Sequence, residues 1–224
     1  MNWIRESVNR SKTLKDHYKM HEIDIFIKDE ITNGVNPDLV FTTLSKMIPS
    51  HLLSGVDIVY IGQFGIFKEK QATAVFQDGA IYVSNEQESD QDMIDDIVHE
   101  LAHSVEERFT QFIYNENDLK NEFLGKRVRL YDIMNHYGYK PPESLRSAYH
   151  YDEGIDTYLY KKAGYEALWN LISGLFLSPY SVTSLREYFA VGFEYYFMGD
   201  KSQIKKTCPI LYSKLENLEY MEKK

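Results

Sequence analysis

Residues 99 to 103 read His-Glu-Leu-Ala-His, and this pentapeptide constrains the chain more than any other feature of the sequence. On an α-helix, positions four apart lie one turn above each other, so His99 and His103 can direct their imidazoles at one ion, with Glu100 beside them. At about 100° per residue, the opposite side of the helix carries an apolar stripe: Ile94, Val98, Leu101 and Val105. The pattern predicts a helix over about residues 90–110 that packs one face on a core and presents the histidines to a cleft.

The predicted secondary structure changes from mainly strands to mainly helices at about residue 90. Before it, apolar runs predict strands at residues 23–27 and 58–61, and Asn36-Pro37 predicts the start of a helix between them. The Asp78-Gly79 pair predicts a β-hairpin of residues 72–84, because it supplies the positive φ angles that a tight turn requires. Further helices are expected at residues 116–137, 151–161, 164–175 and 184–198 and after Pro209.

These patterns predict an α+β fold, in which a small N-terminal mixed sheet and the histidine-bearing helix precede a mainly helical C-terminal half. No repeat, low-complexity tract or Pro/Gly/Ser-rich linker marks a boundary. We therefore expect a single domain over residues 1–224, with a β-rich lobe at about 20–88 and a helical lobe at about 89–224.

His99, Glu100 and His103 form a motif that indicates a zinc site of the zincin class. The two neutral imidazoles and one further carboxylate would fill three tetrahedral positions around one Zn²⁺ and leave the fourth for water. The metal lowers the pKa of that water, and Glu100 can then accept its proton and deliver it to a leaving amine. The sequence thus predicts a hydrolase, specifically a metallopeptidase.

The third ligand has to come from elsewhere in the chain. The metzincin pattern requires Gly at position 106 and His at position 109, but this chain has Glu106 and Phe109. A di-iron bundle would need a second Glu-x-x-His pair, and none exists. The helix at residues 184–198 carries Glu187 and Glu194 on nearly the same face, and geometry alone permits either of them as the ligand.

A resemblance favours Glu187. Tyr180, followed seven residues later by Glu187-Tyr188-Phe189-Ala190, resembles a segment of the anthrax lethal factor-like metallopeptidases, the relatives of the Pro-Pro endopeptidases. The resemblance implies that Glu187 joins His99 and His103 as the third zinc ligand. It also implies that the hydroxyl of Tyr180 donates to the oxyanion that forms during peptide hydrolysis. The similar motifs cover only about residues 97–107 and 180–198. Val191 departs from the family pattern, in which an acidic residue often stands near the site.

Each of these residues also has a structural interpretation. Ser184-x-x-Glu187 is a capping-box pattern, and any tyrosine in a chain with 18 of them can be a packing residue. Asp92 and Asp96 project on the same side as the histidines, either as partners of an imidazole N–H or as part of a solvated acidic face. Glu106 and Glu107 are expected to be exposed.

Charge and composition limit the partners. The net charge of −9 repels phosphate backbones and anionic lipids, so neither nucleic acid nor a membrane is expected as a partner. No signal-peptide core and no run of 18 apolar residues is present, and Cys208 is the single cysteine. We expect a cytoplasmic protein, although these features do not decide against export by a non-classical route or association with a particle. The oligomeric state is left open.

The expected activity is zinc-dependent endopeptidase cleavage of a protein or peptide. Zincins bind an extended substrate along an edge strand that precedes the active helix, and residues 80–84 are the candidate strand. One alternative is a metallopeptidase of the intracellular repressor-cleaving type, in which Tyr180 has no catalytic role. Another is a catalytically silent interaction or assembly protein of the zincin fold.

Overall fold

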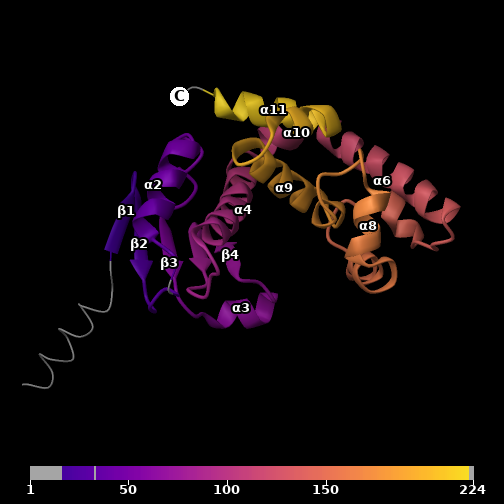
Figure 1. Ribbon diagram of the computed structural model, residues 1–224. Coiled ribbons are helices and arrows are strands. Elements are labelled where there is room, and N and C mark those ends of the chain that lie inside the picture. Colours follow the sequence, from indigo (N-terminus) through magenta and orange to yellow (C-terminus); the bar gives the residue numbers. More distant parts are fainter. Residues whose placement is uncertain (1–16, 33, 222–224) are drawn as a thin grey trace, which may run out of the picture. The chain divides into compact units, whose positions relative to one another are not determined.

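The computed structural model describes residues 17–32 and 34–221, which form two compact units. Unit 1 extends to Val105 and unit 2 begins at Glu106, so the division falls inside helix α4 (Asp90–Arg108). The sequence predicts the boundary between a β-rich and a helical lobe earlier, at about residue 89. The described chain is an α+β fold in which a small mixed sheet is followed by a mostly helical remainder (Figure 1).

The sheet of unit 1 has five strands in the order β1-β2-β3-β5-β4. The two outer pairs, β1 with β2 and β4 with β5, are antiparallel, while β2, β3 and β5 run parallel. The strands are β1 (His17–Met20), β2 (Ile23–Ile27), β3 (Ile58–Ile61), β4 (Ala74–Gln77) and β5 (Ala80–Val83). The strands and hairpin expected from residue 23 onward are confirmed, whereas β1 was not predicted.

The expected edge strand is wrong. Residues 80–84 were expected at the edge, but β5 lies between β3 and β4, and the edge strands among those described are β1 and β4. The reason lies in the connection from β3. The chain passes through α3 (Gly65–Lys70) and enters the hairpin at β4, and the returning strand β5 then pairs with β3.

One face of the sheet forms the core of unit 1. Side chains alternate across a strand, and the set on this face is buried: Ile23, Ile25, Ile27, Val59, Ile61, Ile81 and Val83. Helix α2 (Pro37–Met47) supplies Val40, Phe41 and Leu44 to the core, and the Asn36 side chain caps its first turn as expected. The other face carries a ladder of rings, with centroids 6.0 Å apart for Phe26 and Tyr60 and 5.4 Å for Tyr60 and Tyr82.

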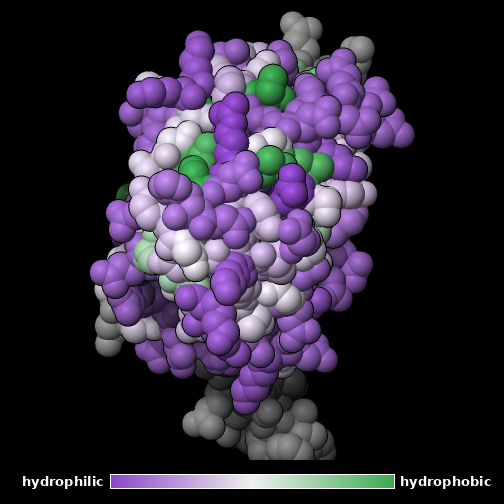
Figure 2. Space-filling model, turned by 90° about the vertical axis from the view of Figure 1, so that its right-hand side faces the viewer, coloured by the Kyte–Doolittle hydropathy of each residue, from purple (hydrophilic) through white to green (hydrophobic). Residues whose placement is uncertain are grey.

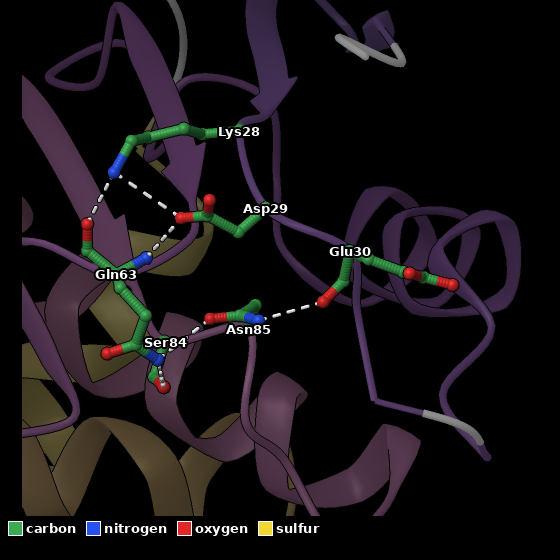
Figure 3. Close-up of polar contacts among 6 residues, drawn as sticks. All are labelled: Lys28, Asp29, Glu30, Gln63, Ser84 and Asn85. Carbon is green, nitrogen blue, oxygen red and sulfur yellow. Dashed lines mark hydrogen bonds and ion pairs between the residues drawn. The ribbon is translucent and has the colours of Figure 1, made fainter.

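A polar network joins the carboxyl ends of the three parallel strands (Figure 3). The main-chain N–H of Gln63 donates to Asp29 (2.8 Å), and the Gln63 side-chain amide donates to Asn85 (2.8 Å). Asn85 in turn donates to the main-chain oxygen of Glu30 (2.8 Å). Since Asn85 immediately precedes the link to α4, this network fixes the point from which the histidine-bearing helix departs.

Unit 2 is helical. Its segments are α5 (Thr110–Tyr114), α6 (Asp118–His136), η1 (Glu143–Arg146), α7 (Glu153–Thr157), η2 (Tyr158–Ala163), α8 (Tyr165–Leu171), η3 (Tyr180–Val182), α9 (Leu185–Phe197), α10 (Lys201–Thr207) and α11 (Pro209–Glu219). The expected helices α6, α8, α9 and α11 are confirmed. The helix expected at residues 151–161 is present as α7 continued by the π-helical η2, while the short helices α3, α5 and α10 were not predicted.

Helix α6 organises unit 2 with charged side chains that bind main-chain groups of other segments. Glu122 accepts from the N–H of Ile210 (2.9 Å) and so caps the first turn of α11. One turn later, the ammonium of the buried Lys126 donates to the main-chain oxygens of Leu175 and Thr207. Together these bonds hold three segments around one helix.

The surface of unit 2 around α8 and the end of α6 is mainly hydrophilic, with small separated apolar areas (Figure 2). Tyr137 and Trp169 are exposed there. Within the described residues, no helix is both long and apolar enough to cross a membrane.

Candidate metal centre

Helix α4 brings the two sequence-predicted histidines together in unit 1. The ring centroids of His99 and His103 lie 4.9 Å apart, with their planes at 87°. The predicted apolar stripe, Ile94, Val98, Leu101 and Val105, is buried. Ser89 starts the helix, because its hydroxyl accepts from the N–H of Asp92 and donates to the Asp92 carboxylate.

Glu100 lies at the open edge of the sheet. Its carboxylate accepts a hydrogen bond of 2.5 Å from the main-chain N–H of Phe76 in β4, and the residue is 8% exposed. Gln77 and Ala80 flank the hairpin turn, and the main-chain N–H of Ser84 donates to the main-chain oxygen of Thr73. Residues 73, 75 and 77 therefore direct their main-chain groups toward β5. The main-chain groups of Phe76 therefore point outward, and Glu100 lies on the outer side of β4.

A close contact sets the height of α4 over the turn that precedes β3. A Cβ atom at Gly55 would lie 2.4 Å from the hydroxyl oxygen of Ser104, the residue that follows His103. Only glycine allows the two segments to approach this closely without a shift. Gly55 thus contributes to the position of the second histidine, although it carries no side chain.

Asp92 and Asp96 make contacts at the start of α4. Asp96 accepts from the side-chain amide of Gln87 (2.9 Å), and Asp92 is bound to Ser89 (3.0 Å). Both carboxylates therefore help to fasten the segment between β5 and α4. These contacts provide an account of the two residues that does not involve the histidines.

The segment from Tyr180 to Glu187 belongs to unit 2 and comprises η3 and the first turn of α9. Ser184 is the N-cap of α9, because its hydroxyl accepts from the main-chain N–H of Glu187 (3.1 Å). This bond engages only the main chain of Glu187, so it is compatible with another role for the carboxylate. Tyr180 is 45% exposed.

Arg127 holds this segment in place, and sequence reasoning missed it. The residue is 0% exposed and donates to the main-chain oxygens of Val182 (2.9 Å from Nε), Thr183 (2.7 Å) and Ala148. Burial lowers the pKa of its guanidinium to about 10, an effect that the charge of Asp152 opposes. A buried arginine cannot be recognised from the sequence, because its acceptors are main-chain oxygens distant along the chain.

Glu106 was expected to be exposed, and this prediction is wrong. Its side chain is 13% exposed, and it accepts a hydrogen bond of 2.6 Å from the hydroxyl of Tyr114 in α5. Tyr114 lies eight residues further along, and α5 folds back toward the end of α4 to form this bond. Glu107, the next residue, is exposed as expected.

The chemistry of the donors suits a metal ion. In the described part of the chain, His99, His103 and Glu187 make up a group that could hold one. Two imidazoles and a carboxylate are donors that zinc accepts, but other divalent metals accept them too. Comparison of the chain with protein-family models, with curated proteins and with solved structures finds no match. The nature of the site therefore has to be argued from its residues.

Proposed function

We propose that the chain is a zinc-dependent endopeptidase of zincin-like fold, with His99, His103 and Glu187 as the ligands of one Zn²⁺. When bound, the metal would supply a Lewis acid for the scissile carbonyl and lower the pKa of a coordinated water. Glu100 acts as the general base, which takes a proton from the attacking water and passes it to the leaving amine. Tyr180, as the resemblance to the lethal factor-like family implies, donates a hydrogen bond to the oxyanion.

The observation that carries this proposal is the position of Glu100. A nearly buried carboxylate, on the residue that follows His99 in α4, reaches the outer side of the edge strand β4. An extended peptide that adds to β4 would pair with the outward main-chain groups of Ala74 and with the oxygen of Phe76. Its scissile bond would then pass close to the base, which is the arrangement that hydrolysis requires.

A second observation supports Glu187 as the third ligand. His99, His103 and Glu187 each offer one ligand atom, and these three atoms lie within 4.8 Å of one another. Glu194 is not a member of this group, so the grouping favours Glu187.

One observation favours a different function, that of a catalytically silent zincin-fold protein. The bond from Phe76 gives Glu100 a structural role, since it fastens α4 to the edge of the sheet. An intact glutamate beside the histidines would then be retained for stability and would not require a reaction. The substrate of a peptidase and the partner of a silent protein would both be polypeptides, so activity has to decide between them.

The test is a peptide-library digest with purified, zinc-loaded protein. Wild type and Glu107→Gln, an exposed change on the same helix, are expected to cleave, whereas Glu100→Gln should bind zinc and be slower by about 10²- to 10⁴-fold. Zinc content measured alongside should fall for Glu187→Gln and stay at one ion for Glu194→Gln. Wild type without stoichiometric zinc would defeat the proposal. Equal cleavage by wild type and Glu100→Gln would defeat the mechanism.

A further inference from the structure

Unit 2 exposes a group of aromatic side chains over α7, η2 and α8. Tyr151, Tyr160, Tyr165 and Trp169 are each between 37% and 64% exposed. The rings of Tyr160 and Tyr165 are in edge contact, with centroids 5.5 Å apart. Trp169 lies four residues after Tyr165 in α8, so these two rings share one face of the helix. Single exposed rings are common on a protein surface, but a group of them marks a site of interaction.

Carboxylates of α7 lie beside these rings. The hydroxyl of Tyr151 donates to Oδ2 of Asp156 (3.3 Å). Burial raises the pKa of the Tyr165 phenol, and the negative charge of Asp156 raises it further, so this carboxylate is also close to Tyr165. Within the described residues, neither Asp156 nor Glu153 forms an ion pair with a lysine or arginine. The rings therefore lie in a negative field that the chain itself does not neutralise.

The backbone that carries these rings is unusual. Tyr160 lies in the π-helical turn η2, and Gly164, with a φ of 79°, separates this turn from α8. In a continuous α-helix, side chains five residues apart would stand about 140° apart around the axis. The change of helix type instead brings the ring of Tyr160 against that of Tyr165. A π-helical turn is rare, and such turns occur frequently at functional sites.

Several other rings of unit 2 are covered by a cation of the chain itself. Nζ of Lys120 lies 3.5 Å from the centroid of the Tyr149 ring, and Nζ of Lys201 lies 3.9 Å from that of Tyr196. Among residues 17–32 and 34–221, no lysine or arginine lies over the four exposed rings, although two exposed lysines follow Tyr160 in η2. The ring faces and the carboxylates beside them can therefore receive a cation from another molecule.

We propose that this aromatic and acidic surface of α7, η2 and α8 binds a basic segment of another polypeptide, whose arginine or lysine heads lie on the rings. The face of a Tyr or Trp ring attracts a cation, and the neighbouring carboxylates add to that attraction. A planar guanidinium also stacks on such rings, so the surface favours arginine over lysine. The net charge of −9 attracts the same partner over a longer distance.

The surroundings of these rings argue against an apolar partner. The side of unit 2 around α8 is mainly hydrophilic and has only small separated apolar areas, so an apolar helix would bury little surface there (Figure 2). All the residues of the surface belong to unit 2 and none is a candidate metal ligand. The proposal is therefore independent of the peptidase function.

The experiment measures how tightly the full chain binds a fluorescein-labelled peptide of alternating arginine and serine, by fluorescence anisotropy at low ionic strength. Tyr160→Leu combined with Tyr165→Leu removes two rings, and we expect it to weaken binding by about five- to thirtyfold. The corresponding double change to Phe keeps both ring faces and should restore most of the affinity. Tyr220→Leu is the matched control, because Tyr220 is also exposed but lies at the end of α11. Its affinity should equal that of wild type.

Four outcomes decide the matter. Equal affinity for wild type and the folded Leu double variant refutes the role of the rings. Equal binding of a peptide with uncharged citrulline in place of arginine refutes the preference for a cation. If the Leu double variant melts far below wild type, Asp156→Asn combined with Glu153→Gln replaces it, since asparagine still accepts from Tyr151; weaker binding then supports the proposal and unchanged binding refutes it. Wild type that self-associates, together with a monomeric Leu double variant, would assign the surface to contacts between copies of this chain and refute the proposal.

Discussion

Arg127 allows the support of the Tyr180–Glu187 segment to be measured directly. Its buried guanidinium donates to the main-chain oxygens of Ala148, Val182 and Thr183. Arg127→Met keeps an apolar stem of similar length and removes every donor. Each buried carbonyl left without a donor costs roughly 1–3 kcal/mol, whereas removal of a buried charge offsets part of that sum. We expect a net loss of about 3 kcal/mol in the free energy of unfolding, toward the lower end of the total for three acceptors.

Urea unfolding followed by circular dichroism measures this loss, and a thermal melt should show a midpoint lower by about 6–12 °C. Arg129→Met is the matched control, because Arg129 is exposed two residues further along the same helix. The control should change stability by less than about 0.5 kcal/mol. If Arg127→Met loses no more than Arg129→Met, the hydrogen bonds to the three carbonyls do not stabilise the segment and the reasoning fails.

Two further predictions concern glycine and a surface carboxylate. Gly192→Ala should lower stability by about 1–2 kcal/mol, because its Cβ would lie 2.2 Å from Cδ2 of the buried Leu211. Gly125→Ala, whose Cβ would meet nothing within 4 Å, should raise stability by about 0.5–1 kcal/mol. Urea unfolding measures both changes. The N–H of Gln63, together with Lys28, lowers the pKa of Asp29 below its usual 3.8, so the anion is favoured in the folded state. The stabilisation by Asp29 is therefore present above the unfolded-state pKa and lost as the pH falls through the folded-state pKa. Melting of wild type and Asp29→Asn should differ near neutral pH and converge below about pH 4; a gap that widens in acid would contradict the assignment.

Features set by neighbouring residues could be predicted from the sequence. The Asp78-Gly79 turn has the positive φ angles it was expected to have, 51° and 77°, because that pair is one of the few that adopts them readily. The adjacency of the His99 and His103 rings follows from the helical repeat alone. The N-cap of α9 at Ser184 is likewise a local contact. In each case the physical cause lies within a few residues.

Features set by distant parts of the chain could not be predicted. The order of the strands depends on which strand of the hairpin meets β3, and the sequence of β5 reads equally well as an edge or an interior strand. Strand β1 carries little apolar alternation of its own and is defined by its pairing with β2. The contacts of Glu106 and Arg127 depend on how α5 and η3 fold back. The neighbouring sequence therefore does not show that these two charged side chains are shielded from water. Charged residues are normally exposed, and these two are exceptions because their partners satisfy them.

The bond between Phe76 and Glu100 changes how the glutamate of the His-Glu-Leu-Ala-His motif should be tested. The sequence assigns Glu100 only the role of a base, but the structure gives its carboxylate a partner in the edge strand β4. Glu100→Ala removes both the base and this contact, so a loss of activity in that variant has two explanations. Glu100→Gln keeps an oxygen that can accept from the N–H of Phe76 and loses only the basicity. A glutamine variant that is folded, binds zinc and does not cleave therefore isolates proton transfer, whereas instability confined to the alanine variant measures the structural contact.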